Sequence, residues 1–510
     1  MLELQNPIDA AKWLRSNVSG SLQTNSQNIK SGDGFVAWPG SSTDGRRFVH
    51  DSLSKGAAVC LVEANGVQAF DFKNAIKQVA IYKDLKKFTG HIASEYYEQP
   101  SRHLDVIAVT GTNGKTSTVW WLAQALTHVN SPLAKKCGVI GTLGIGVSDS
   151  INEDLLQSGS HHKGLVPNGL TTPDPVLLQQ SFRKFIDDGF QACAIEASSI
   201  GLAEDRLSGT NIKAAVFTNF TQDHLDYHHT MEAYWAAKMM LFECPFLEVA
   251  VINVDDPKSQ LILSNLQGKT LDLWTISTQR HARLMATAVK YTKNGVACVV
   301  TEGSNSYRLD TSLAGSYNIA NILGVLAILR SMGIAMQDAI NVCQKLTPVP
   351  GRMNVFAQES MPLIIIDYAH TPDALEKALI DSREISKQRD GQLICVFGCG
   401  GNRDKLKRPI MAQVAEKFAD RVVVTSDNSR DENIHDIFSD IKVGFISTVD
   451  VVFEIERSFA ILKSVSEASP NDVILIAGKG HELYQELMGK RFYFSDKEQA
   501  LNALDQRRRQ

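Results

Sequence analysis

The stretch V-T-G-T-N-G-K-T-S-T, Val109 to Thr118, contains a G-K-T triplet and, three residues before its glycine, a second glycine. It overlaps the end of D-V-I-A-V-T (105–110), a short apolar run, and helical spacing continues in T-S-T-V-W-W-L-A-Q-A-L. Strand, glycine-rich loop and helix in this order are the context of a phosphate-binding loop. The strict pattern G-x-x-x-x-G-K-[ST] requires glycine where Val109 stands, so a glycine turn before a buried helix is the alternative. Because the G-K-T triplet is intact, we predict a nucleotide site.

The composition is typical of a globular chain with several domains. The 510 residues are 44% hydrophobic and 21% charged, and this length predicts about three domains. A net charge of −4 argues against a broad nucleic-acid or membrane surface. The N-terminus has no basic segment followed by an apolar one, and no apolar run is long enough to span a bilayer. The eight cysteines are scattered without a C-x-x-C pair, which favours a reduced, cytoplasmic chain without zinc.

Two blocks with an α/β rhythm come first along the chain. Residues 1–100 carry S-G-D-G-F-V-A-W-P-G (31–40) and apolar stretches between turn residues, which predict a small N-terminal α/β domain. Residues 101–345 contain the glycine loop and predict a central, doubly wound sheet of the P-loop ATPase type. The strand candidates of this second block are 105–110, 192–195, 214–217 and 249–254.

The third block, residues 346–510, begins at a predicted hinge, L-T-P-V-P-G-R (346–352), which follows a helical stretch at 318–330. Apolar runs again alternate with helical segments, and this predicts a Rossmann-like C-terminal domain. The strand candidates are 363–368, 393–398, 421–426 and 473–478. The predicted fold class is therefore α/β, with three domains.

A few polar side chains are candidates for phosphate and metal chemistry. The backbone N–H groups of the loop favour anions, Lys115 can neutralise charge on the β- and γ-phosphates, and the Thr116 hydroxyl can ligate Mg²⁺. Glu196 ends an apolar strand, at the sheet edge where ligands bind, and is a further Mg²⁺ candidate. His224 and His228 are four residues apart, but no third ligand stands at the usual spacing. A single histidine near Mg²⁺ is the better interpretation.

Taken together, the motifs resemble those of the Mur ligases, the ATP-dependent amide-forming enzymes that build the peptidoglycan stem peptide. In chain order they are T-G-T-N-G-K-T, E-A-S-S, T-N-F-T-Q-D-H-L-D-Y-H, the A-A-K helix, G-S-Y-N-I-A-N, P-G-R-M and D-Y-A-H-T-P-D-A-L. The resemblance covers nearly the whole chain and is greatest to the diaminopimelate-adding members. The segments G-D-G-F-V-A-W-P-G and D-G-R-R-F resemble the UDP-binding domain of those members.

The resemblance implies ATP, Mg²⁺ and small-molecule substrates, and we expect a monomer. Lys238 matches a lysine that is carbamylated in this family and then ligates Mg²⁺ as a carboxylate would, whereas sequence chemistry alone favours a lysine that extends to solvent from an apolar helix. The implied catalytic residues are Lys115, Lys238, His224 and Glu196. The implied metal ligands are Thr116, Glu196, His224 and carbamylated Lys238. The implied ATP contacts are Gly111, Thr112, Asn113, Gly114, Lys115, Thr116, Ser117, Asn318, Arg352 and Asp367.

Two further sets of residues match substrate contacts of the family. Those for the UDP-MurNAc-dipeptide are Ser26, Ser41, Ser42, Thr43, Thr171, Thr172, Ser198, Glu204 and Arg206. Those for diaminopimelate are Arg403, Asp427, Asn428, Ser429, Arg430, Gly478 and Glu482. Arg430 belongs to D-N-S-R (427–430), which matches the D-N-P-R motif of the diaminopimelate-adding members. Its guanidinium can bind the distal carboxylate of diaminopimelate through two hydrogen bonds, and the amino acid lysine lacks this carboxylate.

The sequence departs from the family pattern at several positions. Ser429 replaces proline, Asn25 and Gln27 flank Ser26 in place of the more usual Asp and Arg, and Leu170 and Glu204 stand where Asn and Gln are common. These departures concern details of substrate binding and leave the implied reaction class unchanged.

The implied reaction joins meso-diaminopimelate to the γ-carboxylate of D-Glu through an acyl phosphate made from ATP. Four alternatives remain. A lysine-adding ligase of the same step is opposed by Arg430, and folylpolyglutamate synthase does not explain the N-terminal block. A D-Ala-D-Ala-adding ligase fits D-Y-A-H-T-P poorly. A non-catalytic nucleotide-binding regulator is opposed by the joint presence of Lys115, Glu196, His224 and Lys238.

Overall fold

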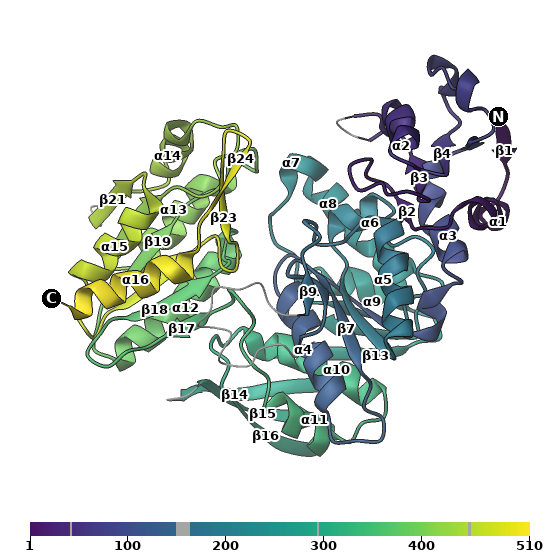
Figure 1. Ribbon diagram of the computed structural model, residues 1–510. Helices are drawn as coiled ribbons and strands as arrows, with labels where there is room; N and C mark the ends of the chain where they lie inside the picture. The colour runs from purple at the N-terminus through teal and green to yellow at the C-terminus, as the bar shows by residue number, and fades with distance from the viewer. Residues whose placement is uncertain (41–42, 149–163, 293–294, 447–449, 510) are drawn as a thin grey trace.

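The computed structural model describes residues 1–40, 43–148, 164–292, 295–446 and 450–509. The chain forms N-terminal, central and C-terminal α/β domains, with the central one between the other two (Figure 1). The predicted α/β fold class is confirmed. Within the described ranges, no helix is long and apolar enough to cross a membrane.

The N-terminal domain is built on a parallel sheet with strand order β1-β5-β4-β3-β2. Its strands are β1 Leu2–Leu4, β2 Leu22–Gln23, β3 Gly34–Ala37, β4 Val59–Glu63 and β5 Val79–Tyr82, and its helices are α1 Pro7–Asn17, α2 Val49–Ser54 and α3 Leu85–Tyr96. Side chains of α1 and α3, such as Leu14 and Ile92, pack on one face of the sheet, and Val49 of α2 packs on the other. Both faces are therefore buried, which explains why strands such as β4 are apolar throughout.

The central domain has a mixed sheet with strand order β16-β15-β14-β13-β12-β11-β6-β10-β7-β8-β9. Its strands are β6 Asp105–Thr110, β7 Cys137–Gly141, β8 Gly144–Gly146, β9 Leu165–Val166, β10 Ala192–Glu196, β11 Ala214–Phe217, β12 Val249–Asn253, β13 Asp272–Ser277, β14 Leu284–Thr292, β15 Gly295–Glu302 and β16 Asn305–Thr311. The middle of the sheet, from β7 to β14, is parallel, and antiparallel strands extend both edges. The strands predicted at 105–110, 192–195, 214–217 and 249–254 are confirmed as β6, β10, β11 and β12.

Helices cover both faces of the central sheet, as a doubly wound sheet requires. They are α4 Lys115–His128, α5 Pro175–Asp187, α6 Ser199–Ala203, α7 Leu225–His228, α8 Met231–Met239, α9 Ser259–Leu266, α10 Asn318–Ser331 and α11 Met336–Cys343. The helix predicted at 318–330 is α10. It is apolar on all sides because it lies in the core between the sheet, α4 and α11.

The C-terminal domain has a sheet with strand order β17-β18-β22-β19-β20-β21, in which only the β17 pairing is antiparallel. Its strands are β17 Asn354–Phe356, β18 Leu363–Asp367, β19 Leu393–Phe397, β20 Arg421–Thr425, β21 Asp450–Glu454 and β22 Val473–Ala477, and a separate hairpin joins β23 Tyr484–Leu487 to β24 Lys490–Tyr493. Its helices are α12 Pro372–Gln388, α13 Lys407–Phe418, α14 Ile434–Lys442, α15 Arg457–Glu467 and α16 Asp496–Arg508. The four strands predicted for this block are confirmed as β18, β19, β20 and β22.

The central and C-terminal domains touch through polar side chains. Asn113 donates to Asp373 at 2.8 Å, and Gln222 donates to Asp404 at 3.0 Å. The carboxyl ends of the parallel strands β6, β10 and β11 face this junction, so the edge of the sheet where ligands bind is enclosed by the C-terminal domain.

Candidate active site

The glycine loop runs from the end of β6 into α4, and its glycines are required by close contacts. A Cβ at Gly111 (φ +148°) would lie 1.9 Å from Thr218 Oγ1, and one at Gly114 (φ +85°) would lie 2.4 Å from Asn321 Oδ1. Val109 is fully buried inside β6 and pairs with β10 and β11. It is therefore a strand residue, and the loop simply begins later than the strict pattern allows.

The N-terminus of α4 is open to an anion. Its N-cap is Gly114, which offers no side-chain hydrogen bond, so the first N–H groups of the helix point into the cavity. Lys115 folds back over the loop and donates to the carbonyls of Gly111 (2.8 Å) and Thr112 (2.9 Å). Burial lowers the pKa of Lys115, while the nearby Glu196 carboxylate acts in the opposite direction. A negatively charged phosphate here would gain both the helix dipole and the ammonium.

The carboxylate of Glu196, at the end of β10, accepts hydrogen bonds from nearby hydroxyl and backbone N–H groups. It accepts from the Thr116 hydroxyl at 3.0 Å, from the Thr142 backbone N–H at 2.8 Å and from the Thr142 hydroxyl at 3.2 Å. Carboxylate and hydroxyl oxygens of this kind are ligands that Mg²⁺ prefers. Thr116 also accepts from Arg352 of the C-terminal domain at 3.2 Å.

Lys238 is buried, in contrast to the lysine extending to solvent that sequence chemistry alone favours. Only 1% of its surface is exposed, and its Nζ lies 4.5 Å from the centre of the Tyr234 ring. Burial, together with the positive charge of Lys115, lowers the pKa of Lys238 well below its usual value. Burial of this kind favours the uncharged, nucleophilic form of an amine.

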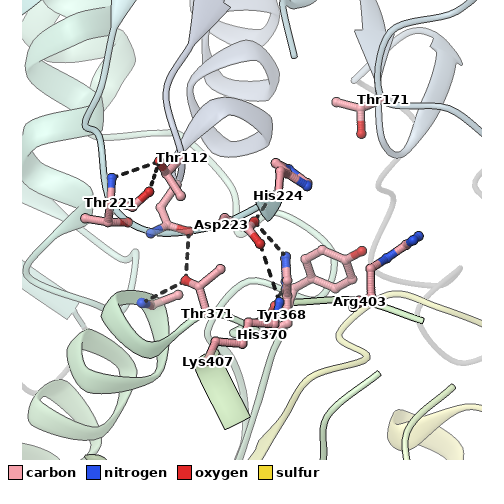
Figure 2. Close-up of polar contacts among 12 residues, drawn as sticks. Thr112, Thr171, Thr221, Asp223, His224, Tyr368, His370, Thr371, Arg403 and Lys407 are labelled. Carbon is pink, nitrogen blue, oxygen red and sulfur yellow. Dashed lines mark hydrogen bonds and ion pairs between the residues drawn. The ribbon is translucent and has the colours of Figure 1, made fainter. Parts of the chain in front are cut away.

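The Asp223 carboxylate of the central domain lies close to a lysine ammonium and a histidine imidazole of the C-terminal domain. Figure 2 shows Asp223 close to His224 and to His370 and Lys407 of the C-terminal domain, with Oδ1 3.4 Å from Lys407 Nζ and Oδ2 3.8 Å from His370 Nε2. Although burial acts to raise it, the Lys407 ammonium holds the pKa of Asp223 below its usual range. Burial lowers the pKa of His224 to about 3 and, with the Lys407 charge, that of His370 to about 4. Both imidazoles are therefore neutral at neutral pH, which is the form of histidine that binds a metal.

Three more of the predicted ATP contacts are Asp367 and Arg352 of the C-terminal domain and Asn318 of the central domain. Asp367, at the end of β18, accepts from the Met353 backbone N–H at 2.7 Å, and burial raises its pKa. The Arg352 guanidinium lies 4.4 Å from the centre of the Tyr368 ring. Asn318 begins α10, donates to the Ala314 carbonyl at 2.7 Å and accepts from Asn321 at 3.1 Å.

A cavity of about 730 Å³ connects these groups. Predicted site residues that line it are Thr112, Asn113, Gly114, Lys115, Thr116, Ser117, Thr171, Glu196, Ser198, His224, Arg352 and Asp367. Gly111, Asn318 and Lys238 are not among the residues that line it. The cavity lies between the carboxyl edge of the central sheet and the C-terminal domain, so it can hold a nucleotide together with the groups that react with it.

Several residues predicted for the dipeptide are linked by hydrogen bonds to Glu196 and Thr142. Thr172 donates to the Glu196 carbonyl at 2.6 Å and bonds the Ser198 hydroxyl at 2.9 Å, and Arg206 donates to the Thr172 carbonyl at 2.9 Å. Thr171 bonds the Thr142 hydroxyl at 3.2 Å. The Glu204 carboxylate is occupied differently, since it is paired with Lys86 and accepts from Tyr227.

The predicted uridine residues are only partly described. The Ser26 side chain is largely buried and its carbonyl accepts from Lys55 at 3.2 Å, and Thr43 is exposed. Asn25 accepts from the Gln27 backbone N–H at 2.9 Å, so it shapes the turn around Ser26. Ser41 and Ser42 lie outside the described residues.

The residues predicted for diaminopimelate form a connected cluster in the C-terminal domain. Asn428 donates to Glu482 at 2.8 Å, and Lys479 donates to Asn428 at 3.0 Å and lies 3.2 Å from Glu482. Gly478 (φ +115°) is required beside Asp427, because a Cβ there would lie 2.6 Å from Asp427 Oδ2. Although burial opposes it, the Lys479 charge lowers the pKa of Asp427.

The rest of this loop orients the two arginines. Arg430 donates through Nη1 to the Gly401 carbonyl at 2.7 Å, and its backbone N–H bonds Glu486 of β23 at 3.0 Å. Arg403 Nη1 lies 3.7 Å from Asp226 of the central domain. The Ser429 carbonyl accepts from Glu432 at 3.0 Å, which closes the turn in the absence of proline.

Sequence reasoning did not single out several residues that line or support the cavity: Thr142, Asp223, Tyr234, Asn321, His370, Lys407 and Lys479. Asp223 and His370 stand inside motifs already noted, T-N-F-T-Q-D-H and D-Y-A-H, and each follows closely after a strand. That position was a usable signal. Lys407 and Lys479 carry no such signal, because their partners belong to distant segments.

Comparison with known proteins agrees with this geometry. The Mur ligase middle domain matches residues 109–329, and the Mur ligase glutamate ligase domain matches residues 351–480. A UDP-N-acetylmuramoyl-L-alanyl-D-glutamate–2,6-diaminopimelate ligase from Acidovorax sp. is 50% identical over 98% of this chain and 97% of its own length. The chain belongs to the Mur ligase family. It is accordingly an ATP-dependent ligase that acts on small-molecule substrates.

Solved structures show the same fold for this Mur ligase. A UDP-N-acetylmuramoyl-L-alanyl-D-glutamate–2,6-diaminopimelate ligase is 32% identical, with a TM-score of 0.63 over 96% of this chain and 95% of that one. The MurF ligase from Thermotoga maritima in complex with ADP is 17% identical, with a TM-score of 0.65 over 96% and 97% of the two chains. The second likeness concerns the fold alone.

Proposed function

We propose that this Mur ligase adds meso-2,6-diaminopimelate to the γ-carboxylate of D-Glu in UDP-MurNAc-L-Ala-D-Glu, with conversion of ATP to ADP and phosphate. The observation that carries the proposal is the single cavity that joins the open helix N-terminus at Gly114, the Glu196 cluster and Arg352 of the C-terminal domain. An enclosed site lined by groups that can bind phosphate suits phosphoryl transfer between bound substrates.

The chemistry follows from the poor leaving group of a carboxylate. A γ-carboxylate oxygen of D-Glu attacks the γ-phosphorus of ATP, ADP leaves, and an acyl phosphate forms. The diaminopimelate amine then attacks the acyl carbon, and phosphate leaves from the tetrahedral intermediate with loss of a proton from nitrogen. Lys115 and the α4 N-terminus hold the phosphate chain, and Arg352 adds positive charge beside Thr116. Enclosure by the C-terminal domain keeps water from the acyl phosphate.

The donor set fits Mg²⁺. We propose that Thr116, Glu196, His224 and carbamylated Lys238 would hold Mg²⁺, with Thr142 orienting the Glu196 carboxylate. When bound, Mg²⁺ supplies positive charge to the phosphate oxygens. The carbamate forms when the neutral Lys238 amine attacks CO₂ and releases a proton, and burial beside Lys115 supports that neutral amine.

The amino acid is selected in the C-terminal domain. We propose that Arg430 binds the distal carboxylate of diaminopimelate and that Glu482, next to Asn428, receives the ammonium group of the same end. Arg403, Asp427, Ser429 and Gly478 shape this pocket. Lysine carries the ammonium but lacks the carboxylate, so it would leave the Arg430 guanidinium without its anion.

Each of the three domains is proposed to bind a different substrate. We propose that residues 1–100 bind the uridine nucleotide through Ser26, Thr43 and their neighbours, residues 101–345 bind ATP, and residues 346–510 bind the amino acid. Thr171, Thr172, Ser198, Glu204 and Arg206 would hold the dipeptide between them. We also propose that the protein acts as a monomer in the cytoplasm, where the nucleotide precursors of peptidoglycan are made.

A ligation assay tests the proposal. Protein, ATP, Mg²⁺ and UDP-MurNAc-L-Ala-D-Glu are incubated with each of meso-diaminopimelate, L-lysine and L-glutamate, and product mass and ADP are measured. We expect one tripeptide product, with diaminopimelate. Product with lysine alone would favour the lysine-adding ligase, and nucleotide binding without any product would favour the regulator.

A further inference from the structure

Asp381 is a buried carboxyl at the junction between the C-terminal and central domains. It lies on α12, only 1% of its surface is exposed, and it contributes to the wall of the cavity. Its Oδ1 accepts from the Ser316 hydroxyl at 2.8 Å and from the Tyr291 hydroxyl. Both donors belong to the central domain: Tyr291 is in β14, and Ser316 precedes α10. One side chain of the C-terminal domain therefore holds two separate segments of the central domain.

The segment held by Asp381 leads directly to Asn318, one of the proposed ATP contacts. A Cβ at Gly315 (φ +94°) would lie 3.2 Å from Asp381 Oδ2 and 3.1 Å from Asn318 Nδ2, so these atoms lie on the same side of the loop. Asn318 accepts from Asn321, and Asn321 contacts the space above Gly114 of the phosphate loop. A continuous chain of contacts thus runs from Asp381 to the phosphate loop.

We propose that Asp381 is a positioning residue for nucleotide binding, which fixes the loop 315–318 through Ser316 when the C-terminal domain closes on the central domain. This inference rests on the proposed ATP site at Asn318. The geometry assigns Asp381 no contact with a reacting atom. Its effect is to hold Asn318 and Tyr317 in the conformation that receives the nucleotide, and to do so only when the two domains are together.

Closure also changes the electrostatic environment of Asp381. In the closed arrangement burial raises the pKa of Asp381 to about 7; the backbone N–H groups of Ser316 and Tyr317 oppose this rise and the Glu384 charge adds to it. Oδ2 is buried, and no donor within the described ranges bonds it. When the domains separate, the carboxyl faces water, where its pKa is close to the ordinary value of about 4.

The other charged groups around Asp381 are already paired. On α12, Lys377 is 2.9 Å from Asp373 and Glu384 is 2.7 Å from Lys387. On the side of α13, Glu376 faces Lys417 at 3.8 Å and Arg383 bonds Asp420 at 2.6 Å. The strands β19 and β22 beneath the helix are apolar. Within the described ranges, Tyr291 on β14 is the titratable group of the central domain that bonds Asp381, whereas the Tyr317 hydroxyl bonds Asp367.

Proton uptake on closure sets the direction of the pH dependence. Between about pH 4 and 7 the closed form binds a proton at Asp381 that the open form lacks, so closure becomes less favourable as the pH rises through this interval. Above about pH 7 both forms are ionised and the dependence ends. Nucleotide affinity that depends on closure should follow the same course.

Three variants distinguish this role from a purely structural one. Asp381→Asn keeps an oxygen acceptor for the two hydroxyls but cannot titrate. Tyr291→Phe removes a donor that favours the ionised carboxylate, so the pKa of Asp381 and the midpoint of the pH dependence should rise. Glu384→Gln removes a nearby negative charge, so that midpoint should fall.

The experiment is calorimetric titration of the full chain with ADP and Mg²⁺ between about pH 5.5 and 8.5, with thermal melting as a check on folding. Over this pH range we expect the ADP affinity of the wild type to fall about tenfold more than that of Asp381→Asn. Ionisation of the ADP phosphates affects both proteins equally, so it does not contribute to this difference. We expect opposite shifts of the midpoint for Tyr291→Phe and Glu384→Gln. Equal pH profiles of ADP affinity for the wild type and Asp381→Asn would overturn the inference. If Asp381→Asn does not fold, unchanged midpoints in Tyr291→Phe and Glu384→Gln would overturn it. Absence of ADP binding to the wild type at every pH would instead overturn the ATP site itself.

Discussion

Replacement of Arg430 by lysine tests how the amino acid is selected. The Arg430 guanidinium is held through Nη1 by the Gly401 carbonyl at 2.7 Å, and no acceptor in the described ranges bonds its Nε or Nη2. Those N–H groups remain for the distal carboxylate of diaminopimelate. A lysine side chain at position 430 keeps the positive charge but lacks the two parallel N–H donors of a guanidinium. It therefore loses one of two charge-assisted hydrogen bonds, each of which contributes about 1.5–3 kcal/mol. We therefore expect kcat/KM for diaminopimelate to fall about 10- to 150-fold.

The assay is steady-state ligation with the concentration of diaminopimelate varied and ATP and UDP-MurNAc-L-Ala-D-Glu held saturating. The loss should appear mainly in KM for diaminopimelate, because the proposed Arg430 contact is with a part of the amino acid that does not react. Arg421→Lys, at the start of β20 and beside Glu467, is the matched control and should change kcat/KM by less than about twofold. A fall of less than about threefold for Arg430→Lys would refute the assigned contact.

The remaining predictions concern the metal site and the stability of the C-terminal domain. Lys238→Ala should abolish most turnover, with partial recovery when a small carboxylate such as formate is added, measured as phosphate release; unchanged activity would exclude a metal-bridging role. Glu196→Gln keeps the shape of the side chain but removes its charge, so the Mg²⁺ concentration for half-maximal activity should rise about tenfold or more, and an unaltered Mg²⁺ titration would argue against Glu196 as a ligand. Asp496→Asn leaves the fully buried Arg457 guanidinium without its carboxylate (2.7 Å), which should lower the unfolding free energy in urea by about 3–5 kcal/mol, and a loss below about 1 kcal/mol would show that the pair is not needed.

Strands and helices of the central and C-terminal domains could be predicted because their local patterns are strong. A run such as L-I-I-I-D-Y is apolar on both faces, as a parallel strand between helix layers must be, and it became β18. The position of Glu196 at the carboxyl end of β10 also followed from the pattern. The small antiparallel strands at the edges of the central sheet were not predicted, since short strands such as β8 and β9 have few residues and weak alternation.

The candidate site could be predicted only where function is carried by residues close together in sequence. The loop from Gly111 to Thr116 is one such segment. The contact of Asp223 with Lys407, about 180 positions away, depends on how two domains meet, and no local pattern encodes it. The burial of Lys238 could not be predicted from its local sequence. Its mostly apolar helix favours a lysine that extends to solvent, whereas the structure buries the amine beside the Tyr234 ring.

The most direct test of the account is the fate of an oxygen atom. UDP-MurNAc-L-Ala-D-Glu labelled with ¹⁸O in the γ-carboxylate of D-Glu is incubated with ATP, Mg²⁺ and meso-diaminopimelate, and the released phosphate is analysed by mass spectrometry. An acyl phosphate transfers one carboxylate oxygen to phosphate, so we expect one ¹⁸O in each phosphate and one diaminopimelate in each product. Phosphate released without label would contradict activation of the carboxylate by ATP.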